Sequence, residues 1–236
     1  MAIPVDPLSR RRSLRLMVGG APALLLGGCA LNAQSEAVGA ATQPLNERIE
    51  ALMQGKGKLP EFRPSQVNPA ALLINSFNGT PEFVPGSYKL AVTGLVSRPL
   101  SLDLADLAAL PQHRCVIRHV CVEGWSAIVA WSGPRLADVV ALAGLSPLAG
   151  YVFIESADQY YESWDLASAL HPQTLLATHM NGAPLPPSNG APVRLATPIK
   201  LGYKLSKWVT GLTLMASLGE RRGYWEDRGY EWFAGL

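Results

Sequence analysis

Residues 113–126 read HRCVIRHVCVEGWS, and this stretch carries the strongest structural signal in the chain. Its first ten residues are rich in β-branched side chains and contain no proline or glycine, which predicts an extended strand over 113–122. Six residues of strand span roughly 20 Å, whereas a disulfide needs Cα atoms about 5.5 Å apart. Cys115 and Cys121 are therefore expected to be free thiols if the strand is continuous; a disulfide between them is the ordinary alternative.

Cys121 has charged and aromatic neighbours, and the strand is expected to end at Gly124, where a ligand can reach the thiol. Nearby cations lower the pKa of a thiol and favour the thiolate that binds metals. The residues alone leave two interpretations open, a metal-binding or nucleophilic cysteine and an inert buried one. No histidine or second cysteine stands at zinc-ligand spacing. A metal at Cys121 would therefore need a cofactor to complete its coordination.

Short strands and isolated short helices surround this stretch. Strands are expected over 88–96, 113–122, 151–156, 175–180, 191–197 and 206–215, and helices over 44–54, 104–110, 135–143 and 165–170. Asp103 is the expected N-cap of the second helix, and Asn181-Gly182 predicts a hairpin-like turn. Residues 55–87 are expected to form a long irregular stretch that is functional or wraps a ligand. The elements do not repeat as βαβ units, which indicates an α+β fold with mixed sheets, short helices and long loops.

The composition is that of a globular chain. Of 236 residues, 48% are hydrophobic and 16% charged, so the chain can bury a sizeable core. The net charge is +2, and the basic residues do not cluster beyond the N-terminus. This distribution argues against a nucleic-acid partner.

The N-terminus resembles an export signal. Residues 9–15 read SRRRSLR and precede an apolar run over 16–26 that is too short to span a bilayer. The pair Arg10-Arg11 resembles a twin-arginine signal, although Ser13 stands where phenylalanine is usual. Such a signal implies export to the periplasm of a chain that has already folded around its cofactor.

Residues 26–29 read LGGC and resemble a lipoprotein cleavage box, with Cys29 as the acylated residue and lipid anchor. Ordinary cleavage near Ala33 is the alternative. The small and polar residues that follow are expected to form a tether. The expected organisation is a signal over 1–33, a tether over 34–43 and one domain over 44–236.

Two motifs connect the domain to a known family. The segment CVEGWS at 121–126, followed by WSGPRL at 131–136, resembles the sulfite oxidase-like molybdopterin oxidoreductases and is most similar to periplasmic methionine-sulfoxide reductases. The resemblance covers residues 70–230. It implies a molybdopterin-binding fold in which Cys121 binds molybdenum and the pterin dithiolene supplies two further sulfurs. A soft thiolate suits such coordination.

The resemblance also implies which residues bind the cofactor. Segment 186–194 (PPSNGAPVR) matches one in which the Asn and the Arg hold the cofactor, and 199–204 (IKLGYK) matches one expected to contact its phosphate. Segment 75–79 (NSFNG) matches a third, although two of its residues differ from the family's Tyr and Glu. The implied cofactor residues are Asn75, Asn78, Gly79, Ser156, Asn189, Arg194, Gly202, Tyr203 and Lys204.

Two charged residues near Cys121 are candidate catalytic residues. Glu123 is expected on the same strand face as Cys121, where it would relay protons or orient water with a raised pKa. An ion pair between Glu123 and Arg118 is the alternative. For the substrate pocket the sequence offers Arg118 and His119.

The resemblance implies oxygen-atom transfer, and the expected reaction is reduction of a sulfoxide-type substrate in the periplasm. Oxidation, as in sulfite dehydrogenases, is the alternative, because segment 223–230 (GYWEDRGY) resembles that branch. A binding module without redox activity is a third. The chain shows no haem-binding motif and no additional dimerisation domain. We therefore expect no haem, a monomer, and a separate electron-transfer protein such as a membrane haem subunit or a cytochrome.

Overall fold

The computed structural model describes residues 45, 49 and 57–236. The chain divides into two compact units, 1–49 and 50–236, and the fold below is that of the second unit. The expected export signal, the tether, Cys29 and most of the expected helix over 44–54 lie outside the described residues. In the described part, no helix is long and apolar enough to cross a membrane.

The described part of the second unit consists of short strands and helices. The strands are β1 (Leu90–Gly94), β2 (Leu100–Leu102), β3 (Gln112–Val120), β4 (Ser126–Pro134), β5 (Tyr151–Ser156), β6 (Tyr161–Asp165), β7 (Leu175–Ala177), β8 (His179–Met180), β9 (Ala183–Pro184), β10 (Arg194–Ala196) and β11 (Val209–Met215). The helices are α3 (Leu104–Ala109), α4 (Leu136–Ala143) and α5 (Leu166–Ala169). The 3₁₀ turns are η1 (Pro64–Gln66), η2 (Pro69–Ala71), η3 (Pro187–Asn189), η4 (Gly202–Lys204) and η5 (Glu226–Arg228).

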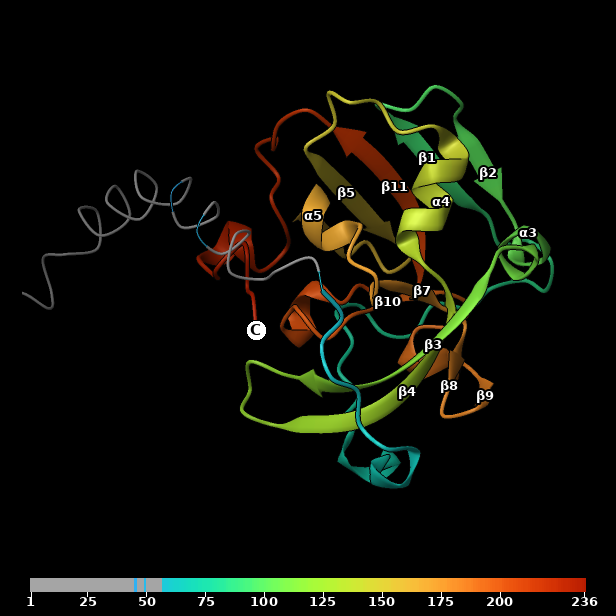
Figure 1. The fold of residues 1–236 in the computed structure, drawn as a ribbon, viewed down its shortest axis with the longest axis vertical. Coiled ribbons are helices and arrows are strands. Elements are labelled where there is room, and N and C mark those ends of the chain that lie inside the picture. Colours follow the sequence, from blue (N-terminus) through green and yellow to red (C-terminus); the bar gives the residue numbers. More distant parts are fainter. Residues whose placement is uncertain (1–44, 46–48, 50–56) are drawn as a thin grey trace, which may run out of the picture. The chain divides into compact units, whose positions relative to one another are not determined.

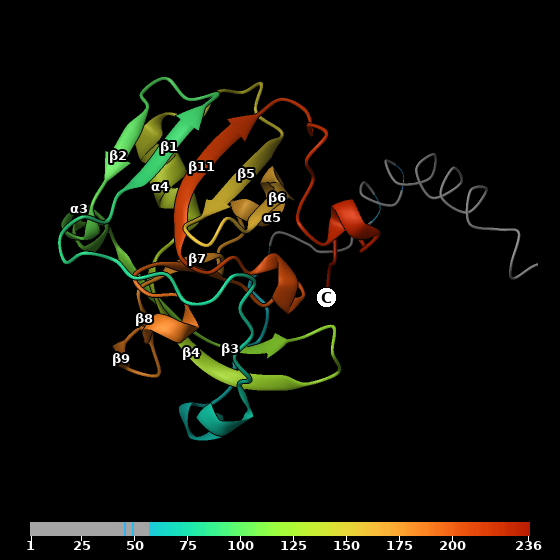
Figure 2. The same cartoon turned by 180° about the vertical axis from the view of Figure 1, so that it is seen from behind.

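A mixed five-stranded sheet with the order β2-β1-β11-β5-β6 forms the larger layer. Only the β1–β11 pairing in it is parallel, and the others are antiparallel. Figures 1 and 2 show α4 and α5 on the same face of this sheet. Val139 and Val140 of α4 join the buried cluster that contains Val152, Ile154 and Leu212 of the sheet. Burial of these side chains holds the helix against the strands.

The long β3–β4 hairpin forms a second layer with β8 and β9. Its register runs from Gln112 opposite Pro134 to Val120 opposite Ser126. Its buried face, with Cys115, Ile117 and Trp131, packs in a separate cluster with residues of β7 and β10. The hairpin is therefore anchored at the strand ends near β7 and carries its 121–125 turn away from that anchor.

Most expected elements are present. Strand β5 has the expected bounds, and α3 begins at Asp103, whose side chain accepts a hydrogen bond from the Asp106 amide. Residues 181–182 join β8 to β9 in a hairpin. Cys115 and Cys121 are both free, as the spacing predicted. The mixed sheets with short helices confirm the expected fold class.

Strands β2, β4 and β6 were not expected, because no strand was predicted over 100–102, 126–134 or 161–165. Hydrophobic and polar residues do not alternate along 126–134, because residues 129–134 are buried or half-buried on both faces of the strand. The predicted strand over 113–122 included Cys121, and this is wrong. Strand β3 ends at Val120, so Cys121 lies in the hairpin turn.

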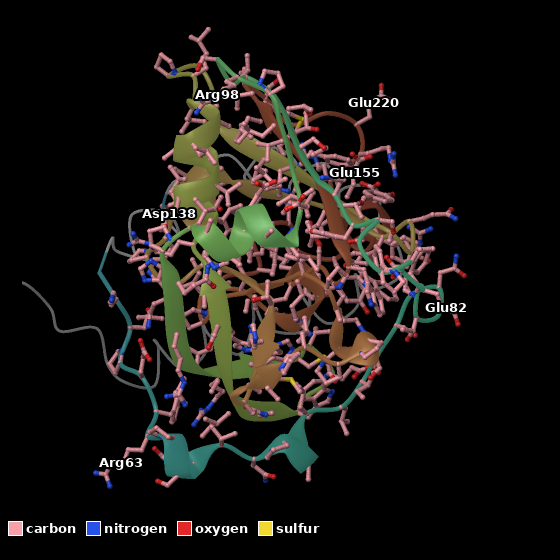
Figure 3. The ribbon with its side chains drawn as sticks, turned by 90° about the vertical axis from the view of Figure 1, so that its right-hand side faces the viewer. Arg63, Glu82, Arg98, Asp138, Glu155 and Glu220 are labelled. Carbon is pink, nitrogen blue, oxygen red and sulfur yellow. The ribbon has the colours of Figure 1, made fainter. Side chains whose placement is uncertain are left out.

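Exposed and buried charges separate clearly. Figure 3 shows Arg63, Glu82, Arg98, Glu155 and Glu220 at the periphery, and all five are exposed. By contrast, Glu162, Arg194, Lys200 and Lys204 are at most 4% exposed. Buried charges are unfavourable unless they are paired or hydrogen-bonded. The surroundings of these four residues therefore indicate where the fold holds a buried ion pair or binds a charged ligand.

Candidate functional site

A cavity of about 460 Å³ opens where several loops of the second unit meet. Its volume lies in the range of about 300–1,000 Å³ that is usual for cofactor sites. The walls come from the irregular segment 72–77, the hairpin end 119–125, the loop 158–160 and the segments 188–194 and 202–208. Trp225 and Tyr230 of the C-terminal segment close one side. Residues 55–87 were predicted to be functional or to wrap a ligand, and the position of residues 72–77 in the cavity wall is consistent with this prediction.

The hairpin turn brings Cys121 into the cavity wall. The Cys121 amide donates to the Trp125 carbonyl at 2.9 Å, and the Gly124 amide donates to the Cys121 carbonyl at 3.1 Å. Gly124 has a φ of +88°, a conformation that glycine adopts without strain. The turn therefore fixes the backbone of Cys121 on both sides and leaves its half-buried thiol facing the cavity.

The thiol of Cys121 has an acidic neighbour. Its Sγ donates to Glu123 Oε2 at 3.7 Å. Burial raises the pKa of the Cys121 thiol above its ordinary value, and the charge of Glu123 adds to this effect. The expectation that nearby cations lower this pKa is wrong for the thiol by itself, because the neighbouring acid and the loss of water act in the other direction.

Glu123 is held by two donors. Trp125 Nε1 donates to its Oε2 at 2.8 Å, and Asn75 Nδ2 donates to the same oxygen at 2.9 Å. These hydrogen bonds lower the pKa of Glu123, so the expected rise is wrong. The alternative ion pair with Arg118 is also not found in the described residues. Arg118 is exposed, does not line the cavity, and places its guanidinium over the Phe62 ring.

A buried and a half-buried cation line the cavity, namely Arg194 and Lys207. Arg194 is 4% exposed and donates to the carbonyls of Asn189 at 2.9 Å and Leu205 at 3.3 Å. Lys207 donates to the carbonyls of Ser188 and Asn75. Burial lowers the pKa of Arg194 to about 10 and, together with the charge of Arg194, that of Lys207 to about 8.

Neither cation has a carboxylate partner in the described residues. The salt bridges found there involve other lysine, arginine and histidine side chains, and neither Arg194 nor Lys207 takes part in one. Asp158 lies near enough to oppose the pKa shift of Lys207 but is itself buried, which raises its own pKa. A buried and a half-buried positive charge without a fixed anion make this side of the cavity a site for an anionic group.

Three other expected cofactor residues also line the cavity, namely Asn189, Gly202 and Tyr203. A Cβ at Gly202 would lie 3.0 Å from His119 Nε2 and 3.2 Å from the Val120 carbonyl. Glycine is therefore required where η4 approaches the end of β3. The structure brings Asn75, Cys121, Glu123 and Arg194 to the same cavity, as the sequence predicted.

Four expected cofactor residues are not brought to this cavity. Asn78 and Gly79 are exposed and lie outside its lining. Ser156 lines a separate depression, with its buried hydroxyl unpartnered. Lys204 is completely buried, and its ammonium lies between two glutamates. The Lys204 amide and carbonyl are engaged with Leu201 and the Trp164 indole, so neither end of the residue faces the cavity.

Several lining residues were not predicted. Lys207 and Asp158 are the charged ones, and Phe77, Trp225 and Tyr230 form an aromatic rim. The sequence signal that could have identified Lys207 is its position, since it is a second lysine three residues after Lys204. His119, a candidate for the pocket, does line it; its ring stacks on Trp125 at 5.6 Å. Burial, with Arg194 and Lys207 nearby, lowers the pKa of His119 to about 3, so the ring is neutral.

These features fit a phosphorylated, sulfur-bearing cofactor. Arg194 and Lys207 provide charge for a phosphate, and Gly202 allows close approach of the backbone. Cys121 provides one soft ligand, and the buried Nδ1 of His119 has no partner among the described residues and is available to a ligand. A group of three or more His, Cys, Asp or Glu side chains that would hold a metal ion by itself is not found among the described residues.

The model of the oxidoreductase molybdopterin-binding domain matches residues 77–225. The chain belongs to this family. It is an oxidoreductase with a molybdopterin-binding domain, of the sulfite oxidase-like kind that the motifs indicated. The family accounts for the pairing of a single cysteine with an anion site, because the cofactor supplies the remaining metal ligands.

Two curated relatives and one solved structure resemble this oxidoreductase. The chain is 39% identical over 216 residues to YedZ1 of Azospira oryzae, which is named as a subunit of a protein-methionine-sulfoxide reductase; the match covers 89% of this chain and 82% of that protein. It is 33% identical over 144 residues to the uncharacterized oxidoreductase YuiH of Bacillus subtilis, covering 61% of this chain and 72% of YuiH.

The sulfane dehydrogenase SoxCD from Paracoccus pantotrophus has a similar fold. The TM-score is 0.58 at 23% identity, over 61% of this chain. The matched part spans 42% of the SoxCD chain. This likeness confirms the sulfite oxidase-like fold.

Proposed function

We propose that this oxidoreductase reduces a sulfoxide-type substrate, with Cys121 as the protein ligand of molybdenum. The observation that carries the proposal is the carboxylate of Glu123, 3.7 Å from the Cys121 thiol and kept ionised by two donors. A negative charge at this point opposes an anionic substrate such as sulfite, but not a neutral sulfoxide. The name of the Azospira relative supports the same direction.

The cavity divides the work between two groups of residues. Arg194 and Lys207, with Asn189, Gly202 and Tyr203, would hold the anionic part of the cofactor. Cys121 would anchor the metal, and Asn75 would act through Glu123. The cations are then neutralised by the cofactor, and the aromatic rim is left to receive the apolar substituents of a sulfoxide.

When bound, the cofactor supplies two-electron oxygen-atom transfer. Reduction of a sulfoxide consumes two protons and two electrons and releases a thioether and water. Glu123 Oε2 is the carboxylate oxygen nearest the thiol, and Trp125 and Asn75 hold it in place. Because this carboxylate stays ionised, we assign to it the role of a hydrogen-bond acceptor that orients a water molecule at this mouth of the cavity. His119 stays neutral and orients a ligand through its free ring nitrogen.

The electrons would come from a separate electron-transfer protein, a membrane haem subunit or a cytochrome, with no haem bound by this chain. From its N-terminal segment we propose that the enzyme is exported to the periplasm by the twin-arginine route and is anchored by a lipid at Cys29. We also propose that it is a monomer. Fractionation of the native host, with a Cys29→Ser variant, tests the anchor: the variant should leave the membrane fraction. Retention of the variant in the membrane fraction of a host that lacks the electron-transfer partner would disprove it.

Metal analysis of enzyme from a cofactor-competent host tests the family chemistry in this chain. We expect about one molybdenum per chain, the stoichiometry implied by one thiolate site. Cys121→Ser should abolish turnover and change the spin-resonance signal of the metal. A purified chain that contains no molybdenum would favour a binding module without redox activity.

The direction of the reaction is tested by two assays on the same preparation. Sulfoxide-dependent oxidation of a reduced dye should be observed, and sulfite-dependent reduction of a cytochrome should be absent or slow. The resemblance of residues 223–230 to sulfite dehydrogenases makes the second assay necessary. Activity with sulfite alone would overturn the proposed direction.

A further inference from the structure

Three ionisable side chains meet in the protein interior beside the cavity. Lys204 Nζ lies 2.5 Å from Glu162 Oε1 and 2.5 Å from Glu226 Oε1, and it also donates to the Ser163 carbonyl at 3.1 Å. The three side chains are at most 1% exposed. We call them the Lys204 cluster. No step of the proposed reaction uses them.

The Lys204 cluster joins three separate parts of the chain. Lys204 belongs to η4, which also carries Gly202 and Tyr203 into the cavity wall, and Glu162 belongs to strand β6. Glu226 begins η5 in the C-terminal segment 222–231, which runs outside β6 (Figures 1 and 2). A buried ion pair is favourable only in good geometry, and breaking it is strongly destabilising. The Lys204 cluster therefore fixes this segment on η4 and β6.

The packing at Gly223 shows how closely the segment is seated. A Cβ on Gly223 would overlap the carboxylates of both Glu226 and Glu162. Gly223 also forms a β-bridge with Glu162, and the Tyr224 amide donates to the Tyr161 carbonyl at 3.0 Å. The backbone of the segment thus lies directly against the two acids that Lys204 holds.

The same segment supplies the outer wall of the cavity. Trp225 and Tyr230 line the cavity and pack on each other at 5.0 Å. The Tyr224 ring packs on the Phe77 ring at 4.1 Å between centroids, so the segment also supports the third residue of the aromatic rim. Glu226 is the immediate neighbour of Trp225, which links the buried cluster directly to a lining residue.

We propose that Lys204 is a positioning residue that, through Glu162 and Glu226, seats the 222–231 segment and so sets the aromatic wall that receives the substrate. Lys204 is then not a ligand of the cofactor, in contrast to the role that the family motif implies. The part that concerns the substrate rests on the proposed function of the cavity. The part that concerns the segment and the cofactor rests on the geometry of the Lys204 cluster.

The variant Glu226→Ala tests the proposal on the molybdenum-loaded enzyme. It removes the side chain through which the 222–231 segment contacts Lys204. Lys204 stays paired with Glu162, so a buried pair of opposite charges remains. Glu226→Gln keeps an oxygen that can accept from Lys204 and serves as the conservative rescue. Glu220→Ala, at an exposed glutamate of the same C-terminal stretch, is the matched control.

Three measurements are made on each variant. In Glu226→Ala, amide exchange of residues 223–231 should rise by about tenfold or more, while β1 and β11 keep their protection. Molybdenum per chain should stay at the wild-type value. KM for a small sulfoxide should rise roughly fivefold or more, with kcat within about twofold, because only binding contacts are lost. Glu226→Gln and Glu220→Ala should resemble wild type in all three.

Two results would overturn the proposal. One is loss of molybdenum from Glu226→Ala while residues 223–231 keep their protection, which would return Lys204 to the cofactor site. The other is unchanged exchange and unchanged KM. Failure of the proposed function is distinguishable from both: the wild-type enzyme would then show no sulfoxide turnover, and exchange and molybdenum content would still decide whether the Lys204 cluster seats the segment.

Discussion

At the scale of single residues, the cavity depends on two cations that lack a fixed partner. Arg194 is buried and Lys207 is half-buried, and the charge of Arg194 opposes the charged form of Lys207. Such a pair is unfavourable in the empty protein and favourable once an anion is bound. The cavity therefore favours an anionic cofactor more strongly than a lysine and an arginine on the protein surface would.

Lys207→Met should weaken cofactor binding by about 2 kcal/mol, roughly thirtyfold, the usual contribution of a charged hydrogen bond. The same variant should stabilise the cofactor-free protein, because it removes a buried like charge beside Arg194. Molybdenum content and urea denaturation of the cofactor-free protein measure the two effects. Lys89→Met, at an exposed lysine paired with Asp103, is the control. Equal molybdenum content in both variants would remove Lys207 from the site.

Glu162 predicts a pH dependence of stability. Burial raises its pKa well above the ordinary value, against the opposing effect of Lys204, with Glu226 adding to the rise; Tyr160 and Tyr203 also face the two acids. A raised pKa in the folded state means that the folded protein binds the proton more tightly. This contribution is complete below the unfolded pKa, about 4.3, and is lost as pH rises through the folded value.

Thermal denaturation across this range measures the effect. The wild-type melting temperature should carry a component that declines with rising pH, and Glu162→Gln, which cannot ionise, should lack that component. A variant whose pH profile matches wild type throughout would contradict the assignment of the proton to Glu162.

At the scale of elements, the β3–β4 hairpin places Cys121, the proposed metal ligand. Its register is set by the buried face that includes Cys115, Ile117 and Trp131, and a slip by one residue would remove those side chains from their cluster with β7 and β10. Because the register is fixed, the turn can only occur at 121–125. The position of Cys121 in the cavity wall is therefore set by side chains that pack farther along the hairpin.

Gly124→Ala tests the turn. Open space surrounds a Cβ at this position, so the φ of +88° is the only source of strain. An alanine there should cost about 1–2 kcal/mol and lower molybdenum loading by displacing Cys121. Urea denaturation and metal analysis measure both. Gly219→Ala, at a glycine with equal space and no positive φ, should change stability by less than about 0.5 kcal/mol; equal effects of the two changes would refute the argument.

At the scale of the whole molecule, the cavity is assembled from segments that lie far apart in the sequence, from 72–77 to Tyr230. Removing the cofactor should therefore destabilise the entire second unit. A ligand present at a hundred times its dissociation constant contributes about 2.7 kcal/mol, which in a domain of this size shifts the melting temperature by roughly 5–10 °C. Calorimetry of loaded and cofactor-free enzyme checks this shift, and identical melting temperatures would contradict it.

The sequence by itself determined the fold class, the family, the thiol at Cys121 and the cavity-lining residues Asn189, Arg194 and Gly202, because motifs and local periodicity are properties of neighbouring residues. It missed β4 and β6, whose strands are covered on both faces and lack alternation. Only the tertiary structure decided that Lys207 faces the cavity whereas Lys204 does not, and that Arg118 points away. Burial, pairing and pKa depend on residues far apart in the chain. The partners of Lys204 are 42 residues before it and 22 after it, and no local pattern records them.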